Sequence, residues 1–105
     1  MTGKLSSLSD LDRVIHEPAR LLLVALLSAV DTADFLFLLK ESRLTKGNLS
    51  VHLSRLEEAG YLTVKKSFRG KIPHTEYRLT ASGRKAFDKY RKQLESIMPG
   101  KKRKD

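Results

Sequence analysis

The residues best suited to contact a ligand lie on one face of a predicted helix that runs from Lys46 to about Ala59. Leu49, Leu53 and Leu56 recur at the spacing of a buried helical stripe. The opposite and flanking positions are Lys46, Gly47, Asn48, Ser50, Val51, Ser54 and Arg55. Small and hydrogen-bonding side chains let a helix approach the edges of nucleic-acid bases, because Asn pairs with adenine, Arg with guanine, and Val contacts a thymine methyl group.

Single residues on this face keep a second interpretation. Asn48 and Ser50 belong to the residue types that cap helix ends, and Val51 could be one scattered exposed apolar side chain. Lys46, near the helix start, is a candidate phosphate contact. Arg55, two turns beyond Asn48, is a candidate for either a guanine edge or a phosphate.

A second basic group follows where the apolar period changes from about 3.6 to 2. Two alternating stretches surround a turn at residues 69–73, and this pattern predicts a β-hairpin. The basic residues on or beside its tip are Lys65, Lys66, Arg69 and Lys71. Such side chains can enter a narrow minor groove or lie along phosphates. The alternative is a solvated hairpin end.

Two helical segments are predicted near the N-terminus. Ser9-Asp10-Leu11-Asp12 has the pattern of a helix cap and predicts a short first helix to about Ile15. Pro18 interrupts that helix, because the residue before a proline avoids the helical region, and it suits the first turn of a second helix. Residues 20–30 are apolar almost all round, so this second helix is predicted to be buried on every face.

A helix-turn-helix is predicted next. Asp31-Thr32-Ala33-Asp34 repeats the cap pattern and predicts a third helix that ends at about Glu41. Residues 42–44 form a tight connection, after which Thr45 caps the helix with the polar face. Gly60 stands where helices favour a left-handed residue, so it ends that helix.

Composition and charge narrow the function. The 105 residues carry a net charge of +9, and residues 1–60 hold 7 Lys/Arg against 8 Asp/Glu whereas residues 61–105 hold 14 against 4. This asymmetry favours a polyanionic partner, with a solubilising basic face as the alternative. The chain has no cysteine, and its three histidines lack the spacing of metal ligands, so we expect no catalytic residues, metal or cofactor. No signal peptide or membrane-spanning segment is visible, which predicts a cytoplasmic protein.

The fold is predicted to be mainly α with a small β-hairpin: a winged helix-turn-helix with additional N- and C-terminal helices. Residues 44–61 (LTKGNLSVHLSRLEEAGY), 62–68 (LTVKKSF) and 75–83 (TEYRLTASG) are similar to the recognition helix and wing of MarR- and ArsR-type regulators. The resemblance covers about residues 10–95 and is strongest with small single-domain winged-helix regulators. It implies sequence-specific binding of double-stranded DNA by a dimer in transcriptional control.

A homodimer is the second expected partnership. A last helix, about 81–97, follows Thr80, and its apolar stripe matches one near the N-terminus. The predicted interface residues are Leu8, Leu11, Ile15, Phe87, Tyr90, Leu94 and Ile97. In a monomer, however, the last helix could fold back onto the N-terminal stripe, and this alternative remains open.

The sequence therefore predicts one DNA-binding domain over residues 1–98 and a basic disordered tail over residues 99–105. The recognition helix, about 46–59, would enter the major groove, and the wing, about 61–80, would contact the backbone or the minor groove. The alternative function is a winged-helix protein–protein interaction module with non-specific nucleic-acid affinity. The sequence identifies neither the operator nor a small-molecule effector, and it does not separate repression from activation.

Overall fold

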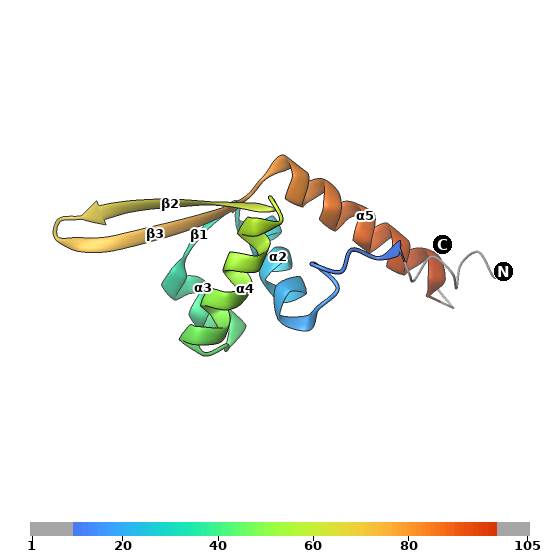
Figure 1. The fold of residues 1–105 in the computed structure, drawn as a ribbon, viewed down its shortest axis with the longest axis horizontal. Coiled ribbons are helices and arrows are strands. Elements are labelled where there is room, and N and C mark those ends of the chain that lie inside the picture. Colours follow the sequence, from blue (N-terminus) through green and yellow to red (C-terminus); the bar gives the residue numbers. More distant parts are fainter. Residues whose placement is uncertain (1–9, 99–105) are drawn as a thin grey trace.

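The computed structural model describes residues 10–98, which form four helices and a three-stranded antiparallel sheet (Figure 1). The helices are α2 (Pro18–Val30), α3 (Phe35–Ser42), α4 (Lys46–Glu58) and α5 (Ala81–Ile97), and the strands are β1 (Thr32–Asp34), β2 (Leu62–Arg69) and β3 (Ile72–Leu79). The strand order is β1-β3-β2. The β2–β3 hairpin and α5 extend to opposite sides of the helical body, along a long axis of 58 Å (Figure 1). The mainly helical fold with a hairpin is confirmed.

The boundaries of α4 follow the predicted caps. The Oγ1 atom of Thr45 accepts a hydrogen bond from the Asn48 backbone N–H at 3.1 Å, which satisfies a donor that the helix start leaves free. Gly60 adopts a φ of 81°, in the left-handed region that favours glycine, directly after the helix. Arg43 ends α3 with a φ of 61° and makes the tight turn between the two helices.

The predicted first helix is wrong for the described part of the chain. Residues 11–17 form turns instead, and Ser9 lies outside the described residues. The Oδ1 atom of Asp12 accepts hydrogen bonds from the backbone N–H groups of Val14 at 2.8 Å and Ile15 at 3.1 Å. This local side-chain bonding competes with a helical ladder. The regular helix begins only at Pro18, capped by the Glu17 carboxylate.

The sheet contains a strand that the sequence did not predict. Thr32–Asp34 pairs with β3, so Ala33 lies opposite Tyr77, and the third helix begins after Asp34 rather than after Asp31. Asp34 rather than Asp31 caps this helix, because its carboxylate accepts a hydrogen bond from the Phe37 N–H at 2.8 Å. Three residues are too short to show a two-residue period, so only pairing with β3 reveals the strand.

The core joins all the helices to the sheet. Its fully buried side chains are Ile15, Leu23, Val24, Leu27, Leu38, Leu49 and Leu56. The prediction that α2 is buried on every face is wrong, because Leu22 and Val30 are 39% and 38% exposed. A short helix in a chain of this size contacts neighbours on only part of its circumference.

The start of α5 is joined tightly to the end of α4. The Thr80 backbone N–H donates to the Tyr61 carbonyl at 2.9 Å, and its hydroxyl donates to the Gly60 carbonyl at 2.7 Å. The same Thr80 hydroxyl oxygen caps α5 by accepting from the Gly83 N–H at 2.9 Å. Gly83 is buried, and a Cβ atom there would overlap the Tyr61 carbonyl.

We therefore expect Gly83→Ala to lower the free energy of unfolding by about 2–3 kcal/mol, because one packed backbone must move away from another. Gly47→Ala is the matched control: no heavy atom lies within 4 Å of the added Cβ, and the helix gains up to about 1 kcal/mol. Urea unfolding of both variants measures the difference. Equal stability of the two variants would contradict the close approach.

Candidate nucleic-acid interface

The polar face of α4 is on the surface of the molecule. Every predicted contact residue is exposed: Lys46, Gly47, Asn48, Ser50, Val51, Ser54 and Arg55. Leu49, Leu53 and Leu56 are buried on the opposite side of the helix. The structure thus brings the predicted residues together on one accessible face, which is free of large side chains except for Arg55 and the helix-start Lys46.

The side chains of Asn48 and Ser50 are free to contact a ligand. Thr45 supplies the capping oxygen of α4, so neither residue is needed for that purpose. Within residues 10–98, neither side chain makes a hydrogen bond to the protein. The capping interpretation of these two residues is therefore wrong.

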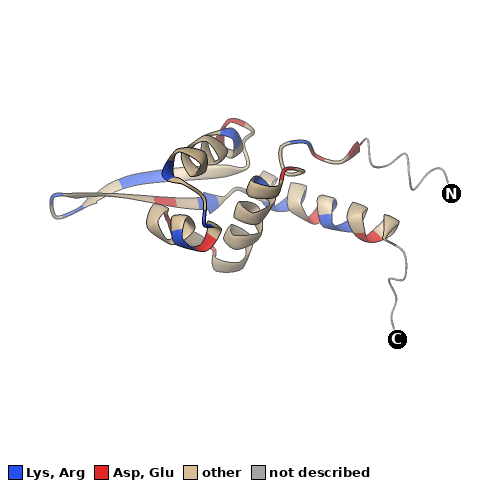
Figure 2. Cartoon of the chain, turned by 90° about the horizontal axis from the view of Figure 1, so that it is seen from below, with Lys and Arg blue, Asp and Glu red and all other residues tan. Residues whose placement is uncertain are grey.

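The hairpin carries its basic residues in two groups. Arg69 and Lys71 flank the tip, where Gly70 adopts a φ of 65°, and Figure 2 shows basic positions along the hairpin and at its tip. Lys65 and Lys66 are neighbours in β2, so their side chains leave opposite faces of the strand. Lys66 faces α4. It lines a hollow of about 180 Å³ together with Ser50, Ser54 and Glu57 of α4 and Tyr77 of β3. Lys65 lines a different hollow, on the β1 side of the sheet.

Two apolar residues at the hairpin tip were missed by the sequence interpretation. Phe68 and Ile72 are 72% and 70% exposed, although both are large hydrophobic side chains. They flank Arg69 and Lys71, so the tip combines apolar surface with positive charge. The signal was present in the sequence as two apolar residues beside the Gly-containing turn, where no core can cover them.

Residues 19–98 match the family of winged helix DNA-binding domains. The chain belongs to this family. In the vocabulary of this family, the second helix of the helix-turn-helix, here α4, is called the recognition helix and the hairpin after it, here β2–β3, is called the wing. A family of DNA-binding domains also agrees with the prediction that the chain is not an enzyme.

The chain is similar in sequence to one protein and in fold to solved structures of regulators. The uncharacterized protein MJ0432 of Methanocaldococcus jannaschii is 35% identical over 79 residues, which cover 74% of this chain and 85% of that protein. A transcriptional regulator homologue from Pyrococcus horikoshii OT3 has a TM-score of 0.84 at 24% identity, covering 93% of this chain and 96% of that chain. A MarR family transcriptional regulator from Silicibacter pomeroyi has a TM-score of 0.62 at 18% identity, covering 96% and 68%.

The residues predicted for a dimer interface separate into two groups in this winged helix chain. Leu11, Ile15 and Tyr90 are buried in its own core, and the Tyr90 hydroxyl lies 2.7 Å from Nδ1 of His16. These three cannot also face a second chain, because they already pack residues 10–17, the N-terminal segment, against α5. This arrangement is the fold-back alternative that the sequence left open.

The other residues of that prediction keep partly accessible surface. Phe87 and Leu94 are half-buried and pack beside the core, and Ile97 is half-buried at the end of α5. Leu8 and the predicted tail, residues 99–105, lie outside the described residues. An interface on α5 would therefore rest on the three accessible residues.

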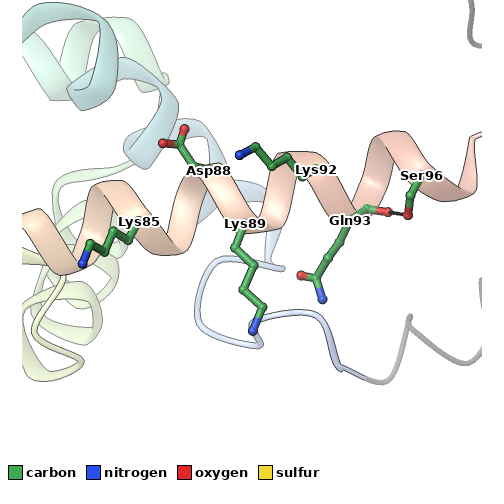
Figure 3. A pocket seen from close by; sticks show the side chains of 6 residues that line it. All are labelled: Lys85, Asp88, Lys89, Lys92, Gln93 and Ser96. Carbon is green, nitrogen blue, oxygen red and sulfur yellow. Dashed lines mark hydrogen bonds between the residues drawn. The ribbon is translucent and has the colours of Figure 1, made fainter.

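A hollow of about 560 Å³ on α5 does not form a ligand site. All of its lining side chains come from one helix, and Figure 3 shows them spread along its outer face: Lys85, Asp88, Lys89, Lys92, Gln93 and Ser96. Asp88 already pairs with Arg91 at 2.8 Å, and this hydrogen bond lowers the pKa of the Asp88 carboxyl. Groups on one convex face do not converge on a bound molecule.

Residues 10–98 contain no group of three or more His, Asp or Glu side chains arranged to hold a metal ion. None of the helices α2 to α5 combines the length and the apolar character that crossing a membrane requires.

Tyr61 connects the recognition helix to the N-terminal segment. Its hydroxyl donates a hydrogen bond to Oδ2 of Asp12, while Asp12 Oδ1 orders the turn at Val14 and Ile15. Burial of the Tyr61 ring, this hydrogen bond and the Asp12 charge raise the pKa of Tyr61 to about 12. The neutral phenol is thus part of the folded structure.

We expect the Tyr61 contact to produce a specific alkaline loss of stability. Because its pKa is raised, Tyr61 stabilises the fold fully below pH 10, and this contribution is lost as the pH rises towards about 12. Tyr61→Phe should lower the free energy of unfolding by about 1–2 kcal/mol at pH 7, and its melting temperature should fall less steeply than wild type above pH 10.

Circular dichroism melts from pH 7 to 12 measure this effect. Tyr77→Phe is the matched control, because burial also raises the pKa of Tyr77 but no hydrogen bond of its hydroxyl occurs within residues 10–98. Wild type and Tyr61→Phe melting at the same temperature across this pH range would contradict the proposed connection.

Proposed function

We propose that this winged helix protein is a sequence-specific transcriptional regulator that binds double-stranded DNA as a homodimer in the cytoplasm. The recognition helix α4 enters the major groove, and the wing contacts the backbone or the minor groove. The observation that carries this proposal is the exposed polar face of α4 beside the basic wing. Lys66 supports it, because this wing residue lies beside Ser50 and Ser54 of the recognition helix.

The two contact regions have different tasks. Asn48, in the first turn of α4, reads a base edge, since residues at the N-terminal end of recognition helices penetrate the groove most deeply. Arg69 and Lys71 at the wing tip contact phosphates, which fix the position of the protein but carry no base information. Contacts of the first kind determine specificity, and contacts of the second kind determine the salt dependence.

The interaction-module alternative requires large apolar anchors on the exposed face of α4. Only Val51, at 51% exposure, is apolar there. Phe68 and Ile72 at the wing tip are the residues that favour a protein partner, but they stand among cations that suit a polyanion. We therefore keep DNA binding as the principal function.

The dimer is proposed to form through α5. The wing and the free end of α5 lie at opposite ends of the molecule (Figure 1), so an interface at α5 leaves both wings outermost. Two symmetry-related recognition helices can then read half-sites about 34 Å apart on one face of a duplex. Phe87, Leu94 and Ile97 supply accessible apolar surface for this contact.

Asn48→Ala should weaken the binding free energy by about 1–3 kcal/mol on a duplex selected for tight binding to the wild type, and by much less on a duplex of scrambled sequence. The matched comparison is Arg69→Ala with Lys71→Ala, which should weaken binding to both duplexes equally. Competition titrations with the two duplexes give the ratio of affinities. If Asn48→Ala leaves that ratio unchanged, α4 is not the reading element and the interaction-module function is favoured instead.

Ile97→Glu should convert a dimer into folded monomers whose affinity for a two-half-site duplex falls more than about tenfold, because one half-site alone binds weakly. Ser96→Glu is the control: it adds the same charge one residue earlier, at an exposed position on the outer face of α5. Light scattering at micromolar concentration gives the oligomeric state. Wild-type protein that is monomeric there would contradict the proposed dimer.

A further inference from the structure

A basic hollow of about 430 Å³ lies beside the C-terminal half of the recognition helix. Its lining residues are Arg13 and Val14 of the N-terminal segment, Arg20 of α2, and Arg55, Glu58 and Ala59 at the end of α4. Three separate parts of the chain thus each contribute an arginine to the lining of one hollow. Neither Arg13 nor Arg20 belongs to the recognition helix or the wing.

We propose that Arg13, Arg20 and Arg55 form a binding site for a backbone phosphate of duplex DNA. This inference rests on the proposed function and adds to it a third contact, outside the recognition helix and the wing. It also assigns Arg55 to a phosphate rather than to a guanine edge.

Arg20 is held in place by the Val14 carbonyl and the His52 ring. Its Nε donates to the Val14 carbonyl at 2.6 Å, and its terminal NH1 nitrogen lies 3.1 Å from Nδ1 of His52. A neutral His52 can accept this hydrogen bond at Nδ1. Both contacts orient the guanidinium without neutralising it, and its remaining N–H groups can donate to an anion. Because the group is ordered before binding, less side-chain entropy is lost when a phosphate binds.

The three arginines keep their positive charge available. Within residues 10–98, no carboxylate oxygen lies within 4.0 Å of their guanidinium nitrogens, whereas Arg78 and Arg84 pair with Asp31. The Glu17 carboxylate accepts a hydrogen bond from the backbone N–H of Arg20 at 2.7 Å, not from its guanidinium. Two carboxylates are near the hollow. Glu58 lines it, and Glu17 caps α2 and lies 3.8 Å from His52. The arginines outnumber them around the hollow, so the local charge favours an anion.

The backbone of Arg13 is also fixed. Asp12, directly before it, accepts hydrogen bonds from Tyr61 and from the N–H of Val14, and Ile15 is fully buried in the core. Arg13 is therefore the exposed residue of an anchored turn.

The chemistry of the site points to a phosphodiester. Guanidinium groups match the two non-bridging oxygens of a phosphate through paired N–H donors. Arg55 belongs both to the exposed face of α4 and to the hollow. A duplex that accepts this face in its major groove therefore presents the flanking backbone strand to Arg13 and Arg20.

The test removes charge from the protein by substitution and from the DNA by replacement of single phosphates. Wild type, Arg13→Ala and Arg20→Lys are titrated with duplexes in which single phosphates are replaced, one at a time, by neutral methylphosphonates. At a phosphate beside the recognised groove, the replacement should weaken wild-type binding by about threefold or more and leave Arg13→Ala unaffected. The slope of log affinity against log salt should fall by about 0.9 for each lost phosphate contact, equally on selected and scrambled duplexes.

Lys89→Ala on α5 is the matched control, because it removes one exposed positive charge away from the hollow. Its salt slope and methylphosphonate pattern should match wild type. Arg20→Lys keeps the charge but removes the guanidinium geometry, and its melting temperature is measured alongside. Should that variant unfold, the exposed Arg13→Ala still decides the outcome.

Two negative results are distinguishable. If wild type binds no duplex, the proposed function fails and the phosphate site fails with it. If wild type binds and Asn48→Ala changes the affinity ratio, but Arg13→Ala retains the wild-type slope and methylphosphonate pattern, the proposed function stands and the arginine site is overturned.

Discussion

The arrangement of this winged helix domain depends on the backbone junction at Tyr61. The Tyr61 carbonyl accepts a hydrogen bond from the Thr80 N–H and lies against Gly83, while its side chain reaches Asp12. The end of the recognition helix, the base of the wing, the start of α5 and the N-terminal segment therefore meet at one residue. A buried close approach of this kind leaves little freedom for these elements to move independently.

This junction explains how a small domain holds α4 and the wing in fixed positions relative to each other. Leu62 and Leu79 pair across the base of the wing and are buried, so the hairpin leaves the body in a defined direction. Beyond that pair the strands become progressively exposed, and the tip residues contact no core. The hairpin thus holds its charged tip far from the body, although only the residues at its base are buried. The recognition helix, in contrast, is held by three buried leucines along its length.

The N-terminal segment, residues 10–17, and the last helix α5 each stabilise the fold and also take part in a proposed contact. Tyr90 of α5 is buried and meets His16, so the last helix completes the core of its own chain. Only part of its apolar stripe remains for a second copy. The N-terminal segment also has two roles, because it packs Leu11 and Ile15 into the core and presents Arg13 on the surface. One short segment thus contributes to stability and, in our proposal, to DNA contact.

Local patterns in the sequence determined most elements of this protein. Thr45, Gly60 and Thr80 act as predicted because capping depends on atoms within a few residues, and the leucine spacing of α4 identifies its buried face. The tertiary structure alone decided the strand at Thr32–Asp34, the turn at Asp12, and the meeting of Arg13, Arg20 and Arg55. The strand and the arginine hollow each require partners that are distant in sequence. The turn at Asp12 requires a choice between two similar sets of local hydrogen bonds. Such pairings depend on where the chain packs, and periodicity within one segment contains no information about its neighbours in space.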